Sequence, residues 1–211
     1  HPYHLVGNLL AGGAGMKNRG IIIAGTGTGV GKTIVTSIIL TGARQRGINA
    51  VPMKPVQTGA LVMEETGGRM IPDLDFACRV IGLTPDQQTR SRMAPFVYTP
   101  ACSPHLAAKL EDREYPDLQH ICDCTEALLD NAHAVVIETA GGILVPLNER
   151  DNNLDLMLKL GFSVVLVADA GLGTINHTLM SIRTIRDSGL ELVGVILCET
   201  QPVEDPDILR D

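Results

Sequence analysis

The nine residues GTGTGVGKT, Gly25–Thr33, form a glycine-rich segment between an apolar run that ends at Ala24 and a run with helical spacing that begins at Thr33. Glycines allow several backbone N–H groups to converge on one anion, and the N-terminus of the following helix adds partial positive charge. Lys32 can reach the outer phosphates of a nucleotide, and the Thr33 hydroxyl can bind magnesium. The segment therefore predicts a loop that binds a nucleoside triphosphate.

The first glycine of this loop is offset from the usual pattern. That pattern has glycine five positions before Gly31, where Thr26 stands, and Gly25 lies one position earlier. A glycine-rich turn that binds nothing is the alternative interpretation. The context, with a buried strand before the loop and a helix after it, favours phosphate binding.

Strands and helices alternate along most of the chain. Short, nearly continuous apolar runs are typical of parallel strands covered on both faces, and they lie at Ile21–Ala24, Ile48–Met53, Ala134–Ile137, Ser163–Ala168 and Leu192–Leu197. Helical spacing is found over Thr33–Arg46, Leu118–Asn131, Asn153–Leu160 and Thr174–Ser188. The pattern predicts an α/β fold of the P-loop NTPase kind, an open sheet of mainly parallel strands with helices on both faces and ligands at the carboxyl ends of the strands.

Residues 59–116 differ in composition from the rest. They are rich in Pro, Met, Gln and charged residues, and only Asp73–Ile81 has a clear helical pattern. We expect this segment to form a cap or to line the site. We also expect residues 1–15 to be a leader, either foreign to the protein or disordered, and residues 16–211 to form one domain.

Composition limits the partners. The 211 residues contain 24 acidic and 17 basic residues, and no cluster of Lys and Arg indicates binding to nucleic acid. No apolar run is long enough to cross a membrane. The five cysteines lack paired Cys-x-x-Cys spacing, so we expect reduced thiols in a cytoplasmic protein and no cysteine metal site.

Acidic residues lie where a magnesium nucleotide site needs them. Glu138 follows the predicted strand Ala134–Ile137, and Asp169 follows another strand and competes for the same role. A solvated loop carboxylate is the alternative for Glu138. Asp73 and Asp75 lie at the start of a predicted helix, where N-capping is a sufficient explanation.

Lys54 follows the second predicted strand, in the segment PMKPVQTG. At that position it should project from the carboxyl edge of the sheet toward the phosphate loop. A lysine there can neutralise charge on a transferring phosphoryl group or on an acidic substrate. A solvated surface lysine fits the sequence equally well.

Five segments, in order along the chain, resemble the dethiobiotin synthetase family: Gly25–Thr33, Lys54–Gly59, Ser103–His105, Glu138–Gly142 and Gly173–His177. The resemblance implies a homodimeric enzyme that uses ATP and Mg²⁺. Its substrates would be 7,8-diaminononanoate and CO2 or bicarbonate, and its products dethiobiotin, ADP and phosphate. The reaction would proceed through a carbamate and a carbamic–phosphoric anhydride, and would rely on positioning and charge neutralisation.

The resemblance also implies roles for individual residues. Catalytic roles fall on Thr28, Lys32 and Lys54. The ATP contacts would come from Gly29, Val30, Gly31, Lys32, Thr33, Ile34, Glu138 and Gly141. Substrate contacts would come from Thr58, Gly142 and, across the dimer interface, Asn176. The magnesium ligands would be Thr33, Asp75 and Glu138, although the nearby Asp73 leaves the register at Asp75 open.

The sequence departs from the family at three points. Thr139 replaces the first glycine of Glu-Gly-Ala-Gly-Gly, which restricts φ. Cys198-Glu199 replaces an Asn-Asp pair that commonly contacts adenine. The sequence also stops at Asp211, before the strand and helix that complete the family's nucleotide pocket, so we expect weaker discrimination among nucleotides.

Two other classes share this loop architecture. Nucleotide-switched ATPases of the partition and cell-division type bind partner proteins, and their loops typically carry a lysine at the position of Gly27, which argues against that class. Amide ligases of the cobyrinate synthase type normally add a glutamine amidotransferase domain, for which the sequence gives no sign.

Overall fold

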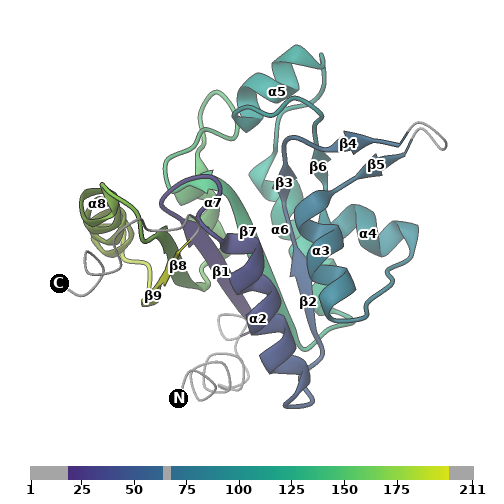
Figure 1. The fold of residues 1–211 in the computed structure, drawn as a ribbon. Coiled ribbons are helices and arrows are strands. Elements are labelled where there is room, and N and C mark those ends of the chain that lie inside the picture. Colours follow the sequence, from purple (N-terminus) through teal and green to yellow (C-terminus); the bar gives the residue numbers. More distant parts are fainter. Residues whose placement is uncertain (1–18, 64–67, 200–211) are drawn as a thin grey trace.

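A computed structural model describes residues 19–63 and 68–199. Its centre is a five-stranded sheet in the order β2-β7-β1-β8-β9, and every pair of neighbouring strands is parallel (Figure 1). The strands are β1 (Gly20–Gly25), β2 (Ala50–Met53), β7 (Ala134–Gly142), β8 (Ser163–Asp169) and β9 (Leu192–Cys198). The predicted α/β fold class is confirmed.

Helices cover both faces of this sheet. Figure 1 shows α2 (Lys32–Arg44) in front of the sheet with α3 (Pro72–Val80) beside it. The apolar core on the opposite side includes residues of α6 (Leu118–Leu129), α7 (Asn153–Leu160) and α8 (Thr174–Asp187). Each strand therefore has to be apolar on both sides, which explains the continuous apolar runs.

The side chains of β1 show how the two cores are divided. Ile21 and Ile23 pack in the cluster that contains α2, whereas Ile22 and Ala24 pack in the cluster that contains α6 and α7. Successive residues of a strand point to opposite faces, so one short segment contributes to both cores. This burial holds the end of β1, and with it the start of the glycine-rich loop, in a fixed position.

The segment after β2 holds more structure than we predicted. Besides α3, it contains α4 (Gln87–Met93) and α5 (Pro104–Leu110), together with short strand pairs: β3 (Val56–Gln57) with β6 (Phe96–Val97), and β4 (Leu61–Val62) with β5 (Arg69–Met70). In α4 only Met93 is buried, so this helix lacks the apolar periodicity that reveals a helix in a sequence.

Within the described residues, no helix is long and apolar enough to span a membrane.

Strand β7 is longer than predicted. We expected it to end at Ile137, but it continues to Gly142, where Gly142 pairs with Gly25 of β1 after an irregularity in the register. Glu138 therefore lies within the strand and is 3% exposed, so the alternative of a solvated loop carboxylate is wrong. Since β7 lies between β1 and β2, the carboxyl ends of these three strands meet at one edge of the sheet.

Candidate active site

A cavity of about 690 Å³ opens at the carboxyl edge of the sheet. Its size is in the range of small-molecule binding sites. It is lined by ten residues that we predicted from the sequence, namely Thr28, Gly29, Gly31, Lys32, Thr33, Ile34, Lys54, Thr58, Glu138 and Gly141. It is also lined by nine that we did not assign to the site, namely Val56, Gln57, Asp73, Ala101, Cys102, Ser103, Pro104, Ala140 and Val145.

The glycine-rich loop forms one wall of this cavity. The Thr26 N–H donates to the Val167 carbonyl at 3.0 Å, which ties the loop to β8. Gly31 has a φ of 97°, a conformation that favours glycine, and it precedes α2 without a side-chain cap on the helix. The first N–H groups of α2 thus have no capping side chain, as an anion-binding helix end requires.

Lys32 folds back across this loop. Its ammonium donates to the Gly27 carbonyl at 2.6 Å. Burial, and next the positive charge of Lys54, lower the pKa of Lys32 to about 8, although Glu138 and Asp73 act in the opposite direction. A negatively charged group that enters the cavity, such as a phosphate, would stabilise the charged form of this buried lysine.

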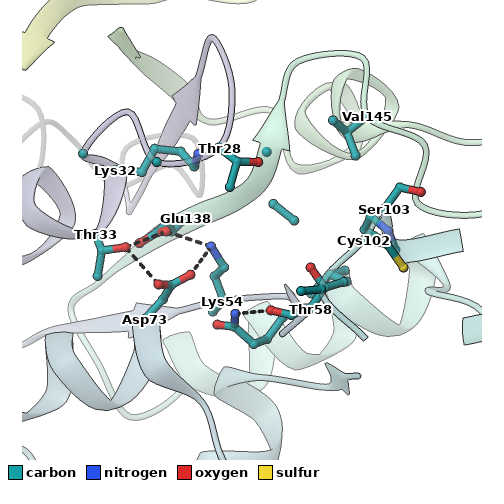
Figure 2. Close-up of a pocket in the computed structure, with 18 of the residues that line it drawn as sticks. Thr28, Lys32, Thr33, Lys54, Thr58, Asp73, Cys102, Ser103, Glu138 and Val145 are labelled. Atoms are coloured by element: carbon teal, nitrogen blue, oxygen red, sulfur yellow. Dashed lines mark hydrogen bonds and ion pairs between the residues drawn. The ribbon is translucent and has the colours of Figure 1, made fainter. Parts of the chain in front are cut away.

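Lys54 is a buried cation between two carboxylates (Figure 2). Its Nζ lies 2.8 Å from Asp73 Oδ2 and 2.7 Å from Glu138 Oε1. Burial alone would lower the pKa of Lys54, but the charges of Glu138 and Asp73 outweigh burial and raise it, so the side chain is charged. Since Lys54 is 4% exposed, the alternative of a solvated surface lysine is wrong.

Oxygen donors that suit magnesium gather at the same point. The Thr33 hydroxyl lies 3.2 Å from Asp73 Oδ1 and 3.1 Å from Glu138 Oε1, as Figure 2 shows. Hydroxyl and carboxylate oxygens are hard ligands of the kind that Mg²⁺ prefers. Among the residues described, no group of three or more His, Cys, Asp and Glu could hold a metal, so phosphates and water would have to supply further ligands.

Asp75 is not at this site, contrary to our assignment of a magnesium ligand. Its Oδ2 accepts the Ile71 N–H at 2.8 Å at the start of α3, and its carboxylate forms an ion pair with Arg90. Residues two apart on a helix lie about 200° apart around the axis, so only one of Asp73 and Asp75 can face Thr33. The structure puts Asp73 there.

The end of β7 forms the part of the cavity wall beside the glycine-rich loop. Thr139 is buried within the strand, and its hydroxyl donates to the Ile23 carbonyl at 3.4 Å. Thr139 does not have a positive φ, so a threonine in place of the family's glycine causes no left-handed backbone strain. Gly141 has a φ of 70°. Asn153 Nδ2 donates to the Ala140 and Gly142 carbonyls, at 2.7 Å each, and fixes this turn from α7.

The far half of the cavity is less charged. Figure 2 shows Thr58, Cys102, Ser103 and Val145 away from the cluster of lysines and carboxylates. The Ser103 side chain makes no capping bond to α5. This half offers hydroxyl groups and apolar surface to a ligand that meets the charged half at one end.

Besides Asp75, four predicted or considered residues do not line the cavity: Val30, Gly142, Asn176 and Asp169. Val30 is buried in the core under the loop, and Asn176 is exposed on α8. A Cβ at Gly142 would lie 3.3 Å from the Thr26 carbonyl oxygen, so this glycine permits close contact with the loop.

Cys198 lies against the phosphate loop. A Cβ at Gly31 would lie 2.9 Å from Cys198 Sγ. Burial, and next the charge of Asp169, raise the pKa of the Cys198 thiol. The expectation of weaker nucleotide discrimination depends partly on residues 200–211, which lie outside the described residues, as do residues 1–15.

Two residues that support the site were not found from the sequence. Thr36 Oγ1 donates to Glu138 Oε2 at 3.3 Å, and its position three residues after Thr33, on the same helix face, was the available signal. Asn153 gave no signal beyond its place at the start of a predicted helix.

Comparison with known proteins gives consistent matches over most of the chain. A family model described as an AAA domain matches residues 19–211. A protein of Anaeromyxobacter sp. (strain Fw109-5), named ATP-dependent dethiobiotin synthetase BioD, is 39% identical over 190 residues, which cover 90% of this chain and 81% of that protein. A protein of Clostridium acetobutylicum with the same name is 33% identical over 184 residues, which cover 85% of this chain and 74% of that protein.

Among solved structures, the chimerical protein CapA2B2 is similar with a TM-score of 0.55 and 15% sequence identity, over 93% of this chain and 82% of that chain. At this identity the similarity supports the fold alone.

Proposed function

This chain belongs to the dethiobiotin synthetase family, and we propose that it closes the ureido ring of dethiobiotin from 7,8-diaminononanoate and CO2 at the expense of ATP. The enzyme class, an ATP-dependent ligase that forms a C–N bond in biotin biosynthesis, follows from the family. The observation that carries the finer proposal is the single cavity in which the phosphate loop faces Lys54 and the Asp73–Glu138 pair. We propose that the reaction takes place in the cytoplasm, where the five free cysteines would stay reduced.

In the proposed reaction one substrate amine takes up CO2 and becomes a carbamate. A carbamate oxygen attacks the γ-phosphorus of ATP, which forms the carbamic–phosphoric anhydride and releases ADP. The second amine then attacks the carbonyl carbon, the C–O bond to phosphate breaks, and the ring closes. These steps need alignment and charge neutralisation more than covalent participation by the protein.

The side chains around the cavity suit this division of work. Lys32 would bind the β- and γ-phosphates, and Thr28 on the same loop would contact the reacting groups. Lys54 would neutralise the negative charges of the carbamate and of the transferring phosphoryl group. Among the described residues that line the cavity, Lys32 and Lys54 are the two buried cations. Thr58, in the less charged half, would bind the diamine.

Thr33, Asp73 and Glu138 would hold Mg²⁺, with Asp73 in place of Asp75. When bound, the ion supplies positive charge to the phosphates. The resident oxygen donors fit it, and the buried carboxylate of Glu138 is oriented for that purpose by the hydroxyl of Thr36 at 3.3 Å.

A homodimer is part of the proposal. Asn176 is expected to contact the substrate, yet it lies on an exposed helix outside the cavity of its own chain. Around it, Ile175, Leu179 and Met180 are exposed by 60% or more, a grouping of apolar side chains typical of an interface. A second copy of the chain would cover this surface and bring Asn176 to the neighbouring site.

The direct test measures ADP release with MgATP and bicarbonate, in the presence and absence of 7,8-diaminononanoate, with dethiobiotin identified by mass spectrometry. We expect ADP release to depend on the diamine and to match dethiobiotin formation one to one. ATP hydrolysis that ignores the diamine would contradict the proposal and favour a nucleotide-switched ATPase.

A further inference from the structure

The ammonium of Lys54 occupies the position between the two carboxylates where a divalent cation would bind. We propose that Lys54 acts as a built-in competitor of the metal, so that the nucleotide-free protein excludes a free divalent cation and admits it only together with phosphates. This inference concerns the regulation of the same site, and it rests on the proposed function only for the identity of the metal and the nucleotide.

All four carboxylate oxygens already have partners. Asp73 Oδ2 and Glu138 Oε1 bind Lys54 Nζ, at 2.8 Å and 2.7 Å. Asp73 Oδ1 lies 3.2 Å from the Thr33 hydroxyl, and Glu138 Oε2 accepts from Thr36 at 3.3 Å. A metal that enters this cluster has to displace at least one of these partners, and the only cation among them is Lys54.

The charges that line the cavity sum to zero. Its charged residues are Lys32, Lys54, Asp73 and Glu138, two cations and two anions, and all except Asp73 are buried. A divalent cation that enters alone would leave an excess of two positive charges in a poorly solvated site, which is costly. The complex of that cation with a nucleoside triphosphate is negatively charged, and its phosphates can accept both lysines.

A second lysine in the same cavity does not compete in this way. Lys32 Nζ is held by the Gly27 carbonyl at 2.6 Å and makes no ion pair with either carboxylate. Arrival of phosphates would draw Lys54 off the carboxylates and toward the reacting groups. The metal therefore replaces Lys54 at the two carboxylates at the same time as Lys54 moves to the phosphoryl group of the bound nucleotide.

The test measures binding of Mn²⁺ alone to the nucleotide-free protein, from the electron paramagnetic resonance signal of free Mn²⁺. Lys54→Met and Lys32→Met each remove one positive charge from the same cavity, so a comparison separates contact with the carboxylates from net charge. We expect Lys54→Met to bind Mn²⁺ at least about tenfold more tightly than the wild type, equivalent to about 1.4 kcal/mol, and Lys32→Met less than about threefold more tightly. Equal effects of the two variants, or no effect of Lys54→Met, would overturn the inference.

Lys54→Met leaves two buried carboxylates close together and can fail to fold, so the wild type provides an independent measurement. We expect the wild type and Asp73→Asn to show the same weak Mn²⁺ binding without nucleotide. A stoichiometric site in the nucleotide-free wild type that Asp73→Asn removes would refute the competition. Failure to form dethiobiotin would reject the proposed reaction instead, and it would leave these metal-binding results unchanged.

Discussion

The substitutions Asp73→Ala and Asp75→Ala should affect different properties of the protein, the first its turnover and the second its stability. The two residues are two positions apart in α3 and share charge and size, so they form a matched pair of substitutions. Asp73 contacts Lys54 and Thr33 in the cavity, whereas Asp75 contacts Ile71 and Arg90 outside it. We expect Asp75→Ala to lower stability with turnover retained, and Asp73→Ala to lose most of its turnover.

The size of the Asp75 effect follows from its contacts. Loss of a first-turn cap, here the 2.8 Å bond from the Ile71 N–H, costs about 0.5–2 kcal/mol. The ion pair with Arg90 is partly exposed, with both side chains near 30%, and adds only about 0.2–1 kcal/mol. The sum of about 0.7–3 kcal/mol, which is less than the usual total stability of a folded domain, lowers Tm by roughly 1–12 °C in a chain of this size.

For Asp73→Ala we expect ADP release to fall at least about 100-fold, because a metal ligand and one partner of Lys54 are lost together. The measurements are urea unfolding, at one protein concentration for all variants, and diamine-dependent ADP release over a titration of Mg²⁺. If Asp75→Ala is folded and has lost its Mg²⁺-dependent turnover while Asp73→Ala retains it, the placement of Asp73 at the metal site is wrong.

Four further changes test other parts of the structure. Lys54→Ala should reduce diamine-dependent ADP release at least about 100-fold while nucleotide affinity, measured by calorimetry, changes less than about tenfold; unchanged turnover would remove Lys54 from the mechanism. The pKa of Lys32 is lowered from 10.5 to about 8 in the folded protein, so the unfolded chain binds the lysine proton more tightly. The free-energy cost of burying the charged lysine is therefore fully present below pH 8, and it disappears as the pH rises to 10.5. The unfolding free energy of the wild type should therefore rise relative to Lys32→Met by roughly 3 kcal/mol over that range, and a constant difference would contradict it. Thr139→Gly should lower the unfolding free energy by about 1–2 kcal/mol, because it removes a buried β-branched side chain from a strand; a more stable variant would show that Thr139 is strained. Leu179→Glu should convert the proposed dimer into a monomer by sedimentation analysis, and an unchanged mass would place the interface elsewhere.

The sequence predicts the central sheet well because its strands need apolar side chains on both faces. Ile21–Ala24 and Val164–Ala168 are continuous apolar runs, and both are buried strands in the structure. The strand order is a tertiary property, and no local pattern indicates that β7 lies between β1 and β2. The short helix α4 was missed for a different reason, since a single buried residue, Met93, gives no periodicity.

The site was predictable where a motif fixes it and not where a helix face decides it. The loop residues Lys32 and Thr33 were located by spacing alone. Asp73 and Asp75 are indistinguishable by composition, and the choice depends on the rotation of α3 against α2, which tertiary packing sets. The partners of Lys54 were likewise beyond the sequence, because they come from α3 and β7, distant in the chain.

The order of the strands has a consequence for how the protein folds. Among the strands of the central sheet, β1 and β2 follow one another in the sequence. In the sheet itself they are separated by β7, which begins at Ala134 (Figure 1). A nascent chain that has not yet reached β7 has synthesised its glycine-rich loop and Lys54 but lacks the strand that joins them, so the first two strands have no native neighbour. Insertion of β7 joins β1 to β2 and brings Glu138 to the site in the same step. A chain without β7 in place therefore lacks both the link between its first two strands and the carboxylate that contacts Lys54 and Thr33, so this part of the sheet and the site form together.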